Sequence, residues 1–279
     1  MIPTFLICGA QKSGTTSLYK TLGQHPKICL ASNKEIHFFD REKNFRKGKK
    51  WYKEFFSHCN QSLHVHICEA TPHYYRNEKA AKRIAHFADV KIIFILRDPV
   101  DRAYSNYWHN KQRGSEIRKF SDAIKSEDGI KKYIKKGLYY KHIKAYYRYF
   151  EKEKVKIVTF EDFVERKGVL KEIFEFLELE YVDVEIATGN KTRAPSSYLS
   201  TLLRYYYKKV SPWVPKYLQT TTKGIRRAVK MYTESEGYKK IDKKVRREIE
   251  PWFLEDIKKI HKNIDVDISS WKTYKRNLA

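Results

Sequence analysis

The chain has 279 residues, of which 41% are hydrophobic and 15% aromatic, so it is long and apolar enough for a sizeable core and is not a disordered protein. Its 58 Lys and Arg residues against 33 Asp and Glu residues give a net charge of +25, which favours an anionic partner such as nucleic acid, an anionic polysaccharide or an acidic membrane surface, unless the lysines serve solubility alone. No run of about 18 apolar residues occurs, so we expect no transmembrane helix.

The first expected element is a buried strand, PTFLICG at 3–9, followed by the loop GAQKSGTT at 9–16. The usual mononucleotide loop is G-x-x-x-x-G-K-[ST], with the lysine after the second glycine. Here Gly9 and Gly14 keep the glycine spacing, but Lys12 lies between them and Thr15 takes the position of the lysine. The loop is therefore expected to bind a phosphate-like group whose needs differ from those of a nucleoside triphosphate.

A helix is predicted to start at Thr15 or Thr16. A glycine turn that leads into a helix exposes backbone N–H groups at the positive end of the helix dipole, and Lys12 would reach the anion from the loop itself. The alternative is an ordinary glycine turn between a strand and a helix. The hydroxyl groups that follow favour the anion site: Ser13, Thr15, Thr16 and Ser17.

Three further strands are predicted along the chain: HVHICEA at 64–70, VKIIFIL at 90–96 and VKIVTF at 155–160. The second of them is a continuous apolar run, which is typical of a strand covered on both faces. A helical segment at 163–179 follows the last strand. Alternation of strand and helix predicts an α/β fold with a central, mostly parallel sheet between helices.

A second anion site is predicted where the strand at 90–96 ends. Arg97 follows the strand, Pro99 fits the first turn of a helix, and Ser105 lies about two turns on, with Arg102 between them. Ligands of open α/β sheets bind at the carboxyl ends of the strands, so an arginine and a serine there would clamp a second phosphate. The alternative is a helix start with solvated arginines. Two sites suggest a ligand with phosphates at both ends.

Beyond about residue 197 the pattern is helical, and we expect residues 197–240 to form a helical extension packed on a single domain that spans 1–279. One part of it suits contact with a membrane surface or a sugar chain, unless its aromatic rings pack inward. This aromatic-basic patch consists of Tyr205, Tyr206, Tyr207, Lys208, Lys209 and Trp213.

The four cysteines, Cys8, Cys29, Cys59 and Cys68, show no C-x-x-C pair and no regular spacing. Cys8 and Cys68 lie in apolar runs, as buried free thiols do, and the pattern favours a reducing compartment. The N-terminus has no signal-peptide layout, so we expect a cytoplasmic protein. The H-x-H pair at 64–66 has no third ligand in view, and strand surface is a better interpretation than a zinc site.

Taken together, the motifs resemble those of the sulfotransferases that use 3′-phosphoadenosine 5′-phosphosulfate (PAPS). GAQKSGTTSLYKTL is similar to their 5′-phosphosulfate loop, and RDPVDRAYSNYW to their 3′-phosphate site, with Arg97 and Ser105 in the matching places. NKEIHFFD at 33–40 and EATPHYY at 69–75 resemble two segments of the heparan sulfate O-sulfotransferases, and GNKTRAPSSYL at 189–199 resembles the loop that covers the cofactor. The resemblance covers roughly residues 1–200 and implies a P-loop-like three-layer fold.

The resemblance also implies roles. Lys12 would stabilise the phosphate that leaves as PAPS becomes PAP, the desulfated product, while Glu35 acts as the base that takes the acceptor's proton. The alternative for Glu35 is that it forms a surface ion pair with Lys34 and has no catalytic role. His37, on the same face of an extended segment, would position the acceptor, serve as base instead, or simply pack beside Phe38. Lys191 and Arg193 would close over the 3′-phosphate, unless they form a solvated loop. A sulfuryl group carries less charge than a γ-phosphate, so no metal is expected.

Two departures keep the acceptor open. The lysine of the heparan enzymes' E-K-T-P segment is Ala70 here, and no cysteine follows Cys68 to form the disulfide typical of the Golgi enzymes near their covering loop. We expect transfer to a hydroxyl or amine of an anionic carbohydrate or glycolipid, with a small molecule, a lipid or a protein tyrosine as alternatives.

Two other classes of protein fit the sequence less well. A P-loop nucleotide kinase or NTPase requires a lysine where Thr15 stands. A nucleic-acid-binding protein would explain the charge but not the ordered set of motifs, and we expect no nucleic-acid partner.

Overall fold

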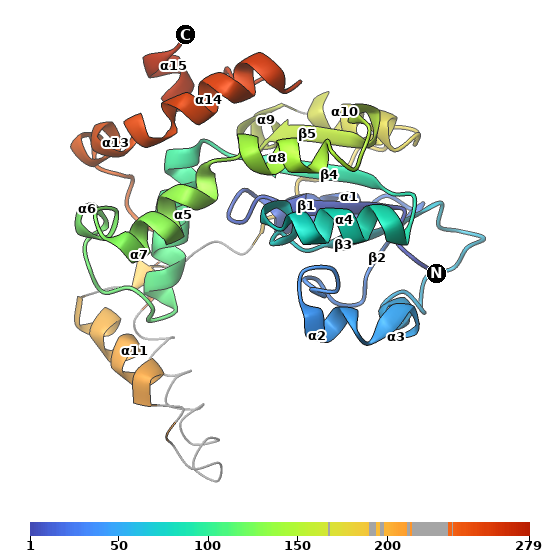
Figure 1. Cartoon of the computed structure of the whole chain (residues 1–279), viewed down its shortest axis with the longest axis horizontal. Helices are drawn as coiled ribbons and strands as arrows, with labels where there is room; N and C mark the ends of the chain where they lie inside the picture. The colour runs from blue at the N-terminus through green and yellow to red at the C-terminus, as the bar shows by residue number, and fades with distance from the viewer. Residues whose placement is uncertain (167, 190–193, 196–197, 211–212, 214–233, 236) are drawn as a thin grey trace. The chain divides into compact units, whose positions relative to one another are not determined.

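The computed structural model describes residues 1–166, 168–189, 194–195, 198–210, 213, 234–235 and 237–279 (Figure 1). The chain forms two compact units. The first unit comprises Met1–Asp98, Leu138–Asn190 and Phe253–Ala279, and the second comprises Pro99–Gly137 and Lys191–Trp252. Among the described residues, no helix is both long enough and apolar enough to cross a bilayer.

A five-stranded parallel sheet organises the first unit, in the order β2-β3-β1-β4-β5. Its strands are β1 (Phe5–Gly9), β2 (Ile28–Leu30), β3 (His66–Ala70), β4 (Lys91–Leu96) and β5 (Val155–Thr159). The four strands predicted from the sequence are confirmed, and the parallel α/β sheet with them. The short β2 was not predicted, because three residues of KICLA carry too little pattern to stand out.

Helices cover both faces of this sheet (Figure 1). The helices of the first unit are α1 (Thr15–Leu22), α2 (Glu42–Phe45), α3 (Gly48–Glu54), α4 (Glu78–Phe87), α8 (Tyr140–Tyr146), α9 (Phe160–Glu165), α10 (Gly168–Phe176), most of α14 (Pro251–Asn263) and α15 (Lys272–Asn277), with short 3₁₀ turns at Tyr74–Arg76 and Lys152–Lys154. Side chains from α1, α9 and α10 pack with Ile7 and Ile93 on one face. On the other face the Phe94 ring meets Tyr146 of α8, at 4.9 Å between ring centroids. Burial on both faces explains why β4 is apolar throughout.

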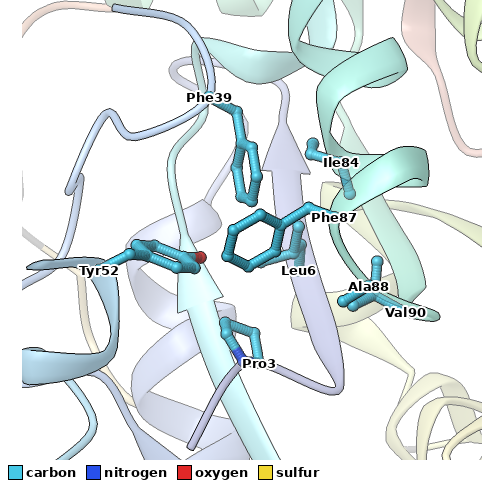
Figure 2. Close-up of a pocket in the computed structure, with 8 residues that line it drawn as sticks. All are labelled: Pro3, Leu6, Phe39, Tyr52, Ile84, Phe87, Ala88 and Val90. Atoms are coloured by element: carbon cyan, nitrogen blue, oxygen red, sulfur yellow. The ribbon is translucent and has the colours of Figure 1, made fainter. Parts of the chain in front are cut away.

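An aromatic cluster fixes the segment that follows β2. Figure 2 shows Phe39, Tyr52 and Phe87 with their rings turned toward one another beside Leu6 of β1. The Phe39 ring centroid lies 5.3 Å from the centroids of Tyr52 and Phe87. The space that these side chains enclose has no room for a water molecule, so it belongs to the core and is not a ligand pocket. The cluster anchors the chain directly after the NKEIH segment.

The second unit is mainly helical. It contains α5 (Pro99–Gln112), α6 (Phe120–Ala123), α7 (Glu127–Gly129), a π-helical turn at Ile130–Ile134, a 3₁₀ turn at Lys135–Gly137, α11 (Tyr198–Val210), α13 (Lys243–Ile249), and a small antiparallel pair of β6 (Ala194–Pro195) with β7 (Glu234–Ser235). Pro99 does open α5, and the helix predicted at 197–210 is confirmed. The expectation that strands end near residue 197 is wrong at β7, whose two residues are too few to give a strand pattern.

Two buried arginines stabilise the second unit. Arg102 is fully buried and donates to the carbonyl of Tyr133, and Arg246 pairs with the Asp101 carboxylate. Residues 214–233 of the expected 197–240 extension lie outside the described residues. The expectation of a single domain stays a prediction.

The interpretation of the cysteines is correct for two of them and wrong for the other two. Cys8 and Cys68 are buried free thiols, and burial raises the pKa of both. Cys29 of β2 and Cys59, which follows α3, form a disulfide with Cα atoms 5.8 Å apart. The two residues are 30 positions apart in the sequence, and only the return of the chain past β2 brings them together. Spacing alone could not reveal this pair.

Candidate active site

The predicted anion loop joins β1 to α1 in the first unit, as expected. Gly14 precedes α1 with φ 91°, and Lys12 also has a left-handed backbone, with φ 70°. A Cβ on Gly14 would stand 2.4 Å from the Phe160 ring, so glycine is required there for space as well as for conformation. The loop is tied to β4 by the Ala10 N–H, which donates to Ile95 O at 2.8 Å.

Arg97 lies next to the same aromatic ring. Its guanidinium carbon stands 4.7 Å from the Phe160 centroid, and its carbonyl accepts a hydrogen bond of 2.9 Å from the Tyr139 hydroxyl. Because Phe160 borders both Gly14 and Arg97, the loop and the arginine lie on the same ring in the first unit. Within the described chain, Ser13 Oγ and Arg97 Nε are buried without a hydrogen-bond partner. Buried donors without partners are costly unless a ligand satisfies them, so this geometry fits an anion.

Lys12 shares that place with Arg97 and Glu35. Burial and, to a lesser extent, the charge of Arg97 lower the pKa of Lys12 to about 8, against the opposing effect of the Glu35 carboxylate. Charges act on a pKa only from nearby, so Lys12, Arg97 and Glu35 lie near one another in the first unit. Lys12 therefore remains a cation at neutral pH but is easier to deprotonate than an ordinary lysine.

Glu35 and His37 do not lie in an extended segment, and that expectation is wrong. Their φ values are 63° and 56°, in the left-handed region that non-glycine residues seldom adopt. Two backbone hydrogen bonds hold the turn: Glu35 N–H donates to Ala70 O at 3.0 Å, and His37 N–H donates to Thr71 Oγ1 at 3.4 Å. The turn still brings the two side chains together, with His37 Nε2 3.9 Å from Glu35 Oε2.

The Glu35 carboxylate is half exposed and surrounded by basic groups. Partial burial would raise its pKa, but Lys34, whose Nζ lies 3.2 Å from Glu35 Oε1, and the nearby His73 and His37 lower it below the ordinary value. Glu35 is therefore ionised at neutral pH and able to accept a proton. Lys34 itself is largely buried and supplies a cation beside Glu35, whose backbone N–H donates to Ala70 O.

Several residues around Glu35 were not predicted. His37 Nδ1 lies 2.9 Å from Asp40 Oδ2, so Asp40 orients the imidazole whose other nitrogen faces Glu35. The His73 ring stands 5.1 Å from that of His37, and burial together with the charges of His37 and Arg76 lowers the pKa of His73 to about 4. Asp40 and His73 both lie inside the quoted motifs, and the 36 positions between His37 and His73 hid the contact between their rings.

A buried carboxyl group supports the turn from below. Glu69 of β3 is fully buried and accepts hydrogen bonds from Thr71 Oγ1 at 2.6 Å, from the Tyr74 hydroxyl at 2.9 Å and from Tyr52. Burial raises the pKa of Glu69, against the effect of these hydrogen bonds. The Tyr74 hydroxyl in turn accepts from the N–H of Phe38 at 3.0 Å. EATPHYY thus positions the segment that carries Glu35.

Two groups of side chains in the described chain have metal-ligand chemistry. Cys29, His58 and Cys59 form one, but the disulfide occupies both sulfurs. Glu35, His37 and His73 form the other, with ligand atoms within 4.8 Å of one another. His64 and His66 are not part of either group: His66 Nε2 lies 2.7 Å from Leu177 O, and His64 Nδ1 accepts from Asn60 N–H at 3.0 Å.

The other predicted binding residues are placed as follows. Thr15 is buried and Thr16 and Ser17 are half-buried in the first turn of α1. A Cβ on Gly189 would lie 2.6 Å from Ser17 Oγ, so the chain that leads to the predicted covering loop passes over that turn. Lys191 and Arg193 lie outside the described residues. Ser105 is buried on α5 of the second unit, and its pairing with Arg97 stays a prediction.

Comparison with known proteins identifies relatives of the whole motif set. A family model described as "Sulfotransferase domain" matches residues 3–249. The human bifunctional heparan sulfate N-deacetylase/N-sulfotransferase 3 is 40% identical over 121 residues, which are 41% of this chain and 14% of that protein. Mouse heparan sulfate glucosamine 3-O-sulfotransferase 5 is 32% identical over 169 residues, 56% of this chain and 47% of that protein. The chain thus spans half or less of the length of these two relatives.

Among solved structures, a sulfotransferase from Alicyclobacillus acidocaldarius superposes with a TM-score of 0.69. It is 24% identical, and the match covers 97% of this chain and 99% of that one. The likeness supports the three-layer fold with its central parallel sheet.

Proposed function

Because the chain belongs to the sulfotransferase domain family, we propose that it transfers a sulfuryl group from PAPS to a hydroxyl or amine of a carbohydrate. One observation carries the proposal. The Phe160 ring borders both Gly14 of the loop and the strand-end Arg97, and the charges of Arg97 and Glu35 both act on the loop lysine Lys12. Two cations and a base beside a helix start are what a phosphosulfate donor and a nucleophilic acceptor require.

The binding residues fit the donor chemically. Ser13 Oγ and Arg97 Nε are buried polar atoms that lack partners in the described chain. Phosphate oxygens of the donor would accept hydrogen bonds from both. The first-turn N–H groups of α1 and the hydroxyls of Thr15, Thr16 and Ser17 would complete the loop site. Arg97, Ser105, Lys191 and Arg193 are proposed to hold the 3′-phosphate.

The reaction needs charge stabilisation on one side and proton removal on the other. Lys12 would stabilise the negative charge that develops on the phosphate oxygen as the bond to sulfur breaks. Glu35 would take the proton of the acceptor as that atom forms its bond to sulfur. His37, oriented by Asp40, would hold the acceptor or Glu35 in place. These protein groups suffice for a sulfuryl group, so we propose no metal.

The acceptor is proposed to be an anionic carbohydrate or glycolipid. The names of the two curated relatives state heparan sulfate as their substrate, and the net charge of +25 attracts polyanions. The cation that the EATP segment lacks at Ala70 would be replaced by Lys34 beside Glu35. Assays with labelled PAPS against desulfated and partly sulfated polysaccharides test this acceptor class, and a small-molecule or tyrosine acceptor would contradict it.

Calorimetric binding of PAP tests the donor site. We expect wild-type protein to bind PAP and Arg97→Ala to bind it roughly 10- to 100-fold more weakly, since a charge-assisted hydrogen bond would be lost. Arg46→Ala is the matched control, because Arg46 is exposed in the same unit and pairs with Glu42 at the surface. Equal affinity of the two variants, or salt-dependent binding of duplex DNA tighter than that of PAP, would contradict the proposal.

The pH dependence of PAP binding is expected to report Lys12. With a pKa of about 8, the lysine carries its proton below that pH and loses it above, while ligand phosphate favours the protonated form. Affinity should therefore fall by up to about tenfold per pH unit above pH 8. Lys12→Arg keeps its charge and should give a flat profile in the same calorimetric series. A wild-type profile that is also flat would exclude Lys12 as the titrating contact.

A further inference from the structure

Helix α11 (Tyr198–Val210) of the second unit packs its polar side inward. Ser200 and Thr201 are buried, Arg204 Nη1 donates to Gln112 O at 3.2 Å, and Lys208 donates to Ser115. The backbone also approaches α5 closely, since a Cβ on Gly114 would stand 2.4 Å from Arg204 O. An ordinary surface helix buries its apolar side, so the orientation of α11 is the reverse of the usual one.

The apolar side of α11 faces outward. Leu199, Leu203, Tyr206 and Val210 follow one another at intervals of four, three and four residues, which places them on one face, and each is 50% to 65% exposed. We call these four residues the α11 stripe (helix labelled in Figure 1). Single exposed apolar residues are ordinary, whereas a continuous row marks an interaction surface.

A cationic cavity borders the α11 stripe. It has a volume of about 530 Å³, and Lys132, Lys136, Lys208 and Lys209 line it together with uncharged residues that include Tyr205. Lys209 Nζ lies 4.8 Å from the Tyr205 ring centroid on the flank of the helix. No carboxylate lines the cavity itself, although Lys132 pairs with Asp128 at 2.8 Å, and the sequence of α11 contains no Asp or Glu. An apolar row beside clustered lysines is complementary to a surface that is apolar within and anionic outside.

We propose that α11 docks the protein onto an anionic membrane surface. The α11 stripe would enter the boundary between lipid headgroups and acyl chains, and the lysines of the cavity would contact lipid phosphates. Charge complementarity and the outward apolar row together favour this occupant. The proposal concerns binding alone, so it does not depend on the proposed sulfuryl transfer.

A second copy of the chain fits the same surface less well. A symmetric dimer through the stripe would bring the Lys209 cations on the flanks of the two helices near one another, with no carboxylate on either α11 to offset them. Four side chains on one helix are also few beside the roughly 20–30 residues per side of a stable interface. A bilayer needs neither self-complementarity nor a large protein partner.

Co-sedimentation with lipid vesicles tests the proposal. Wild-type protein is expected to bind vesicles of phosphatidylcholine with phosphatidylglycerol and to bind phosphatidylcholine alone much more weakly. The pair Leu203→Ser with Val210→Ser should lower the partition coefficient by at least about tenfold, because two side chains no longer gain from burial. Lys209→Gln, which removes the cation on the flank of the stripe, should lower it by about fivefold.

The matched control is Leu63→Ser with Val65→Ser, which removes two comparably exposed apolar residues from the other unit and should leave binding unchanged. Thermal unfolding of every variant should match that of the wild type, which shows that the fold is intact. Wild-type protein that binds neither kind of vesicle would overturn the proposal. So would binding that the stripe variant retains in full, a dimer that the stripe variant dissociates, or binding of soluble anionic polysaccharide with no vesicle binding.

Discussion

Replacing Glu35 by glutamine is expected to lower kcat for sulfuryl transfer by about 10²- to 10⁴-fold, the usual contribution of a general base. Glutamine keeps the size of the side chain and the turn that Ala70 O and Thr71 Oγ1 hold, but it cannot take a proton. Affinity for PAP should stay close to that of the wild type, because the carboxylate acts on the acceptor. Steady-state turnover with labelled PAPS and a competent acceptor measures the effect.

Glu42→Gln is the control for this result. Glu42 lies on α2 in the same stretch of chain and is also surrounded by cations, since hydrogen bonds from Lys79 and Arg83 lower its pKa to about 2. It should turn over at the wild-type rate. His37→Gln separates the two candidate bases: it should cost less than Glu35→Gln if His37 only positions. Full activity of Glu35→Gln together with an inactive His37→Gln would assign the base to the histidine.

Replacing Lys12 by alanine is expected to lower kcat/KM by about 10²- to 10³-fold, as does removal of one donor that stabilises developing charge. The loop should keep its fold, because the Lys12 side chain is not part of the apolar core and Gly14 continues to fit against Phe160. Much of the loss should appear in kcat, since the leaving phosphate gains charge in the transition state. Initial rates at several PAPS concentrations separate kcat from KM.

Lys20→Ala is the control for Lys12→Ala. Lys20 is exposed near the end of α1, four residues after the loop, so its loss changes the same net charge without touching the site. Lys12→Arg should recover part of the activity, because the charge is present but its geometry differs. Equal losses in Lys12→Ala and Lys20→Ala would mean that overall charge, and not the loop lysine, governs the rate.

The sheet and the anion loop could be predicted from the sequence because their signals are local. A continuous apolar run at 90–96 needs cover on both faces, and the glycines of the loop are required within a few residues of the strand that precedes them. Arg97 follows from the same logic, since the end of a central parallel strand is where ligands bind. Resemblance then supplied the role of Glu35.

What could not be predicted depends on contacts between distant segments. The left-handed turn at Glu35 and His37 is stabilised by Ala70 at the end of β3 and by Thr71, which follows it, and no rule for the local sequence NKEIHFFD favours it. The contact between His37 and His73 and the buried Glu69 beneath the turn arise in the same way. Local pattern identifies which residue types are present, whereas topology decides which of them meet.

The Cys29–Cys59 bond encircles the whole stretch that contains Glu35, His37 and the short helices α2 and α3. In the usual entropic treatment, such a disulfide lowers the conformational entropy of the unfolded chain and thereby stabilises the folded protein by about 2–4 kcal/mol. The redox conditions around the protein would therefore decide whether this bond is present and how firmly the turn at Glu35 and His37 is held. Samples prepared with and without reductant would then differ in the order of the segment that carries Glu35.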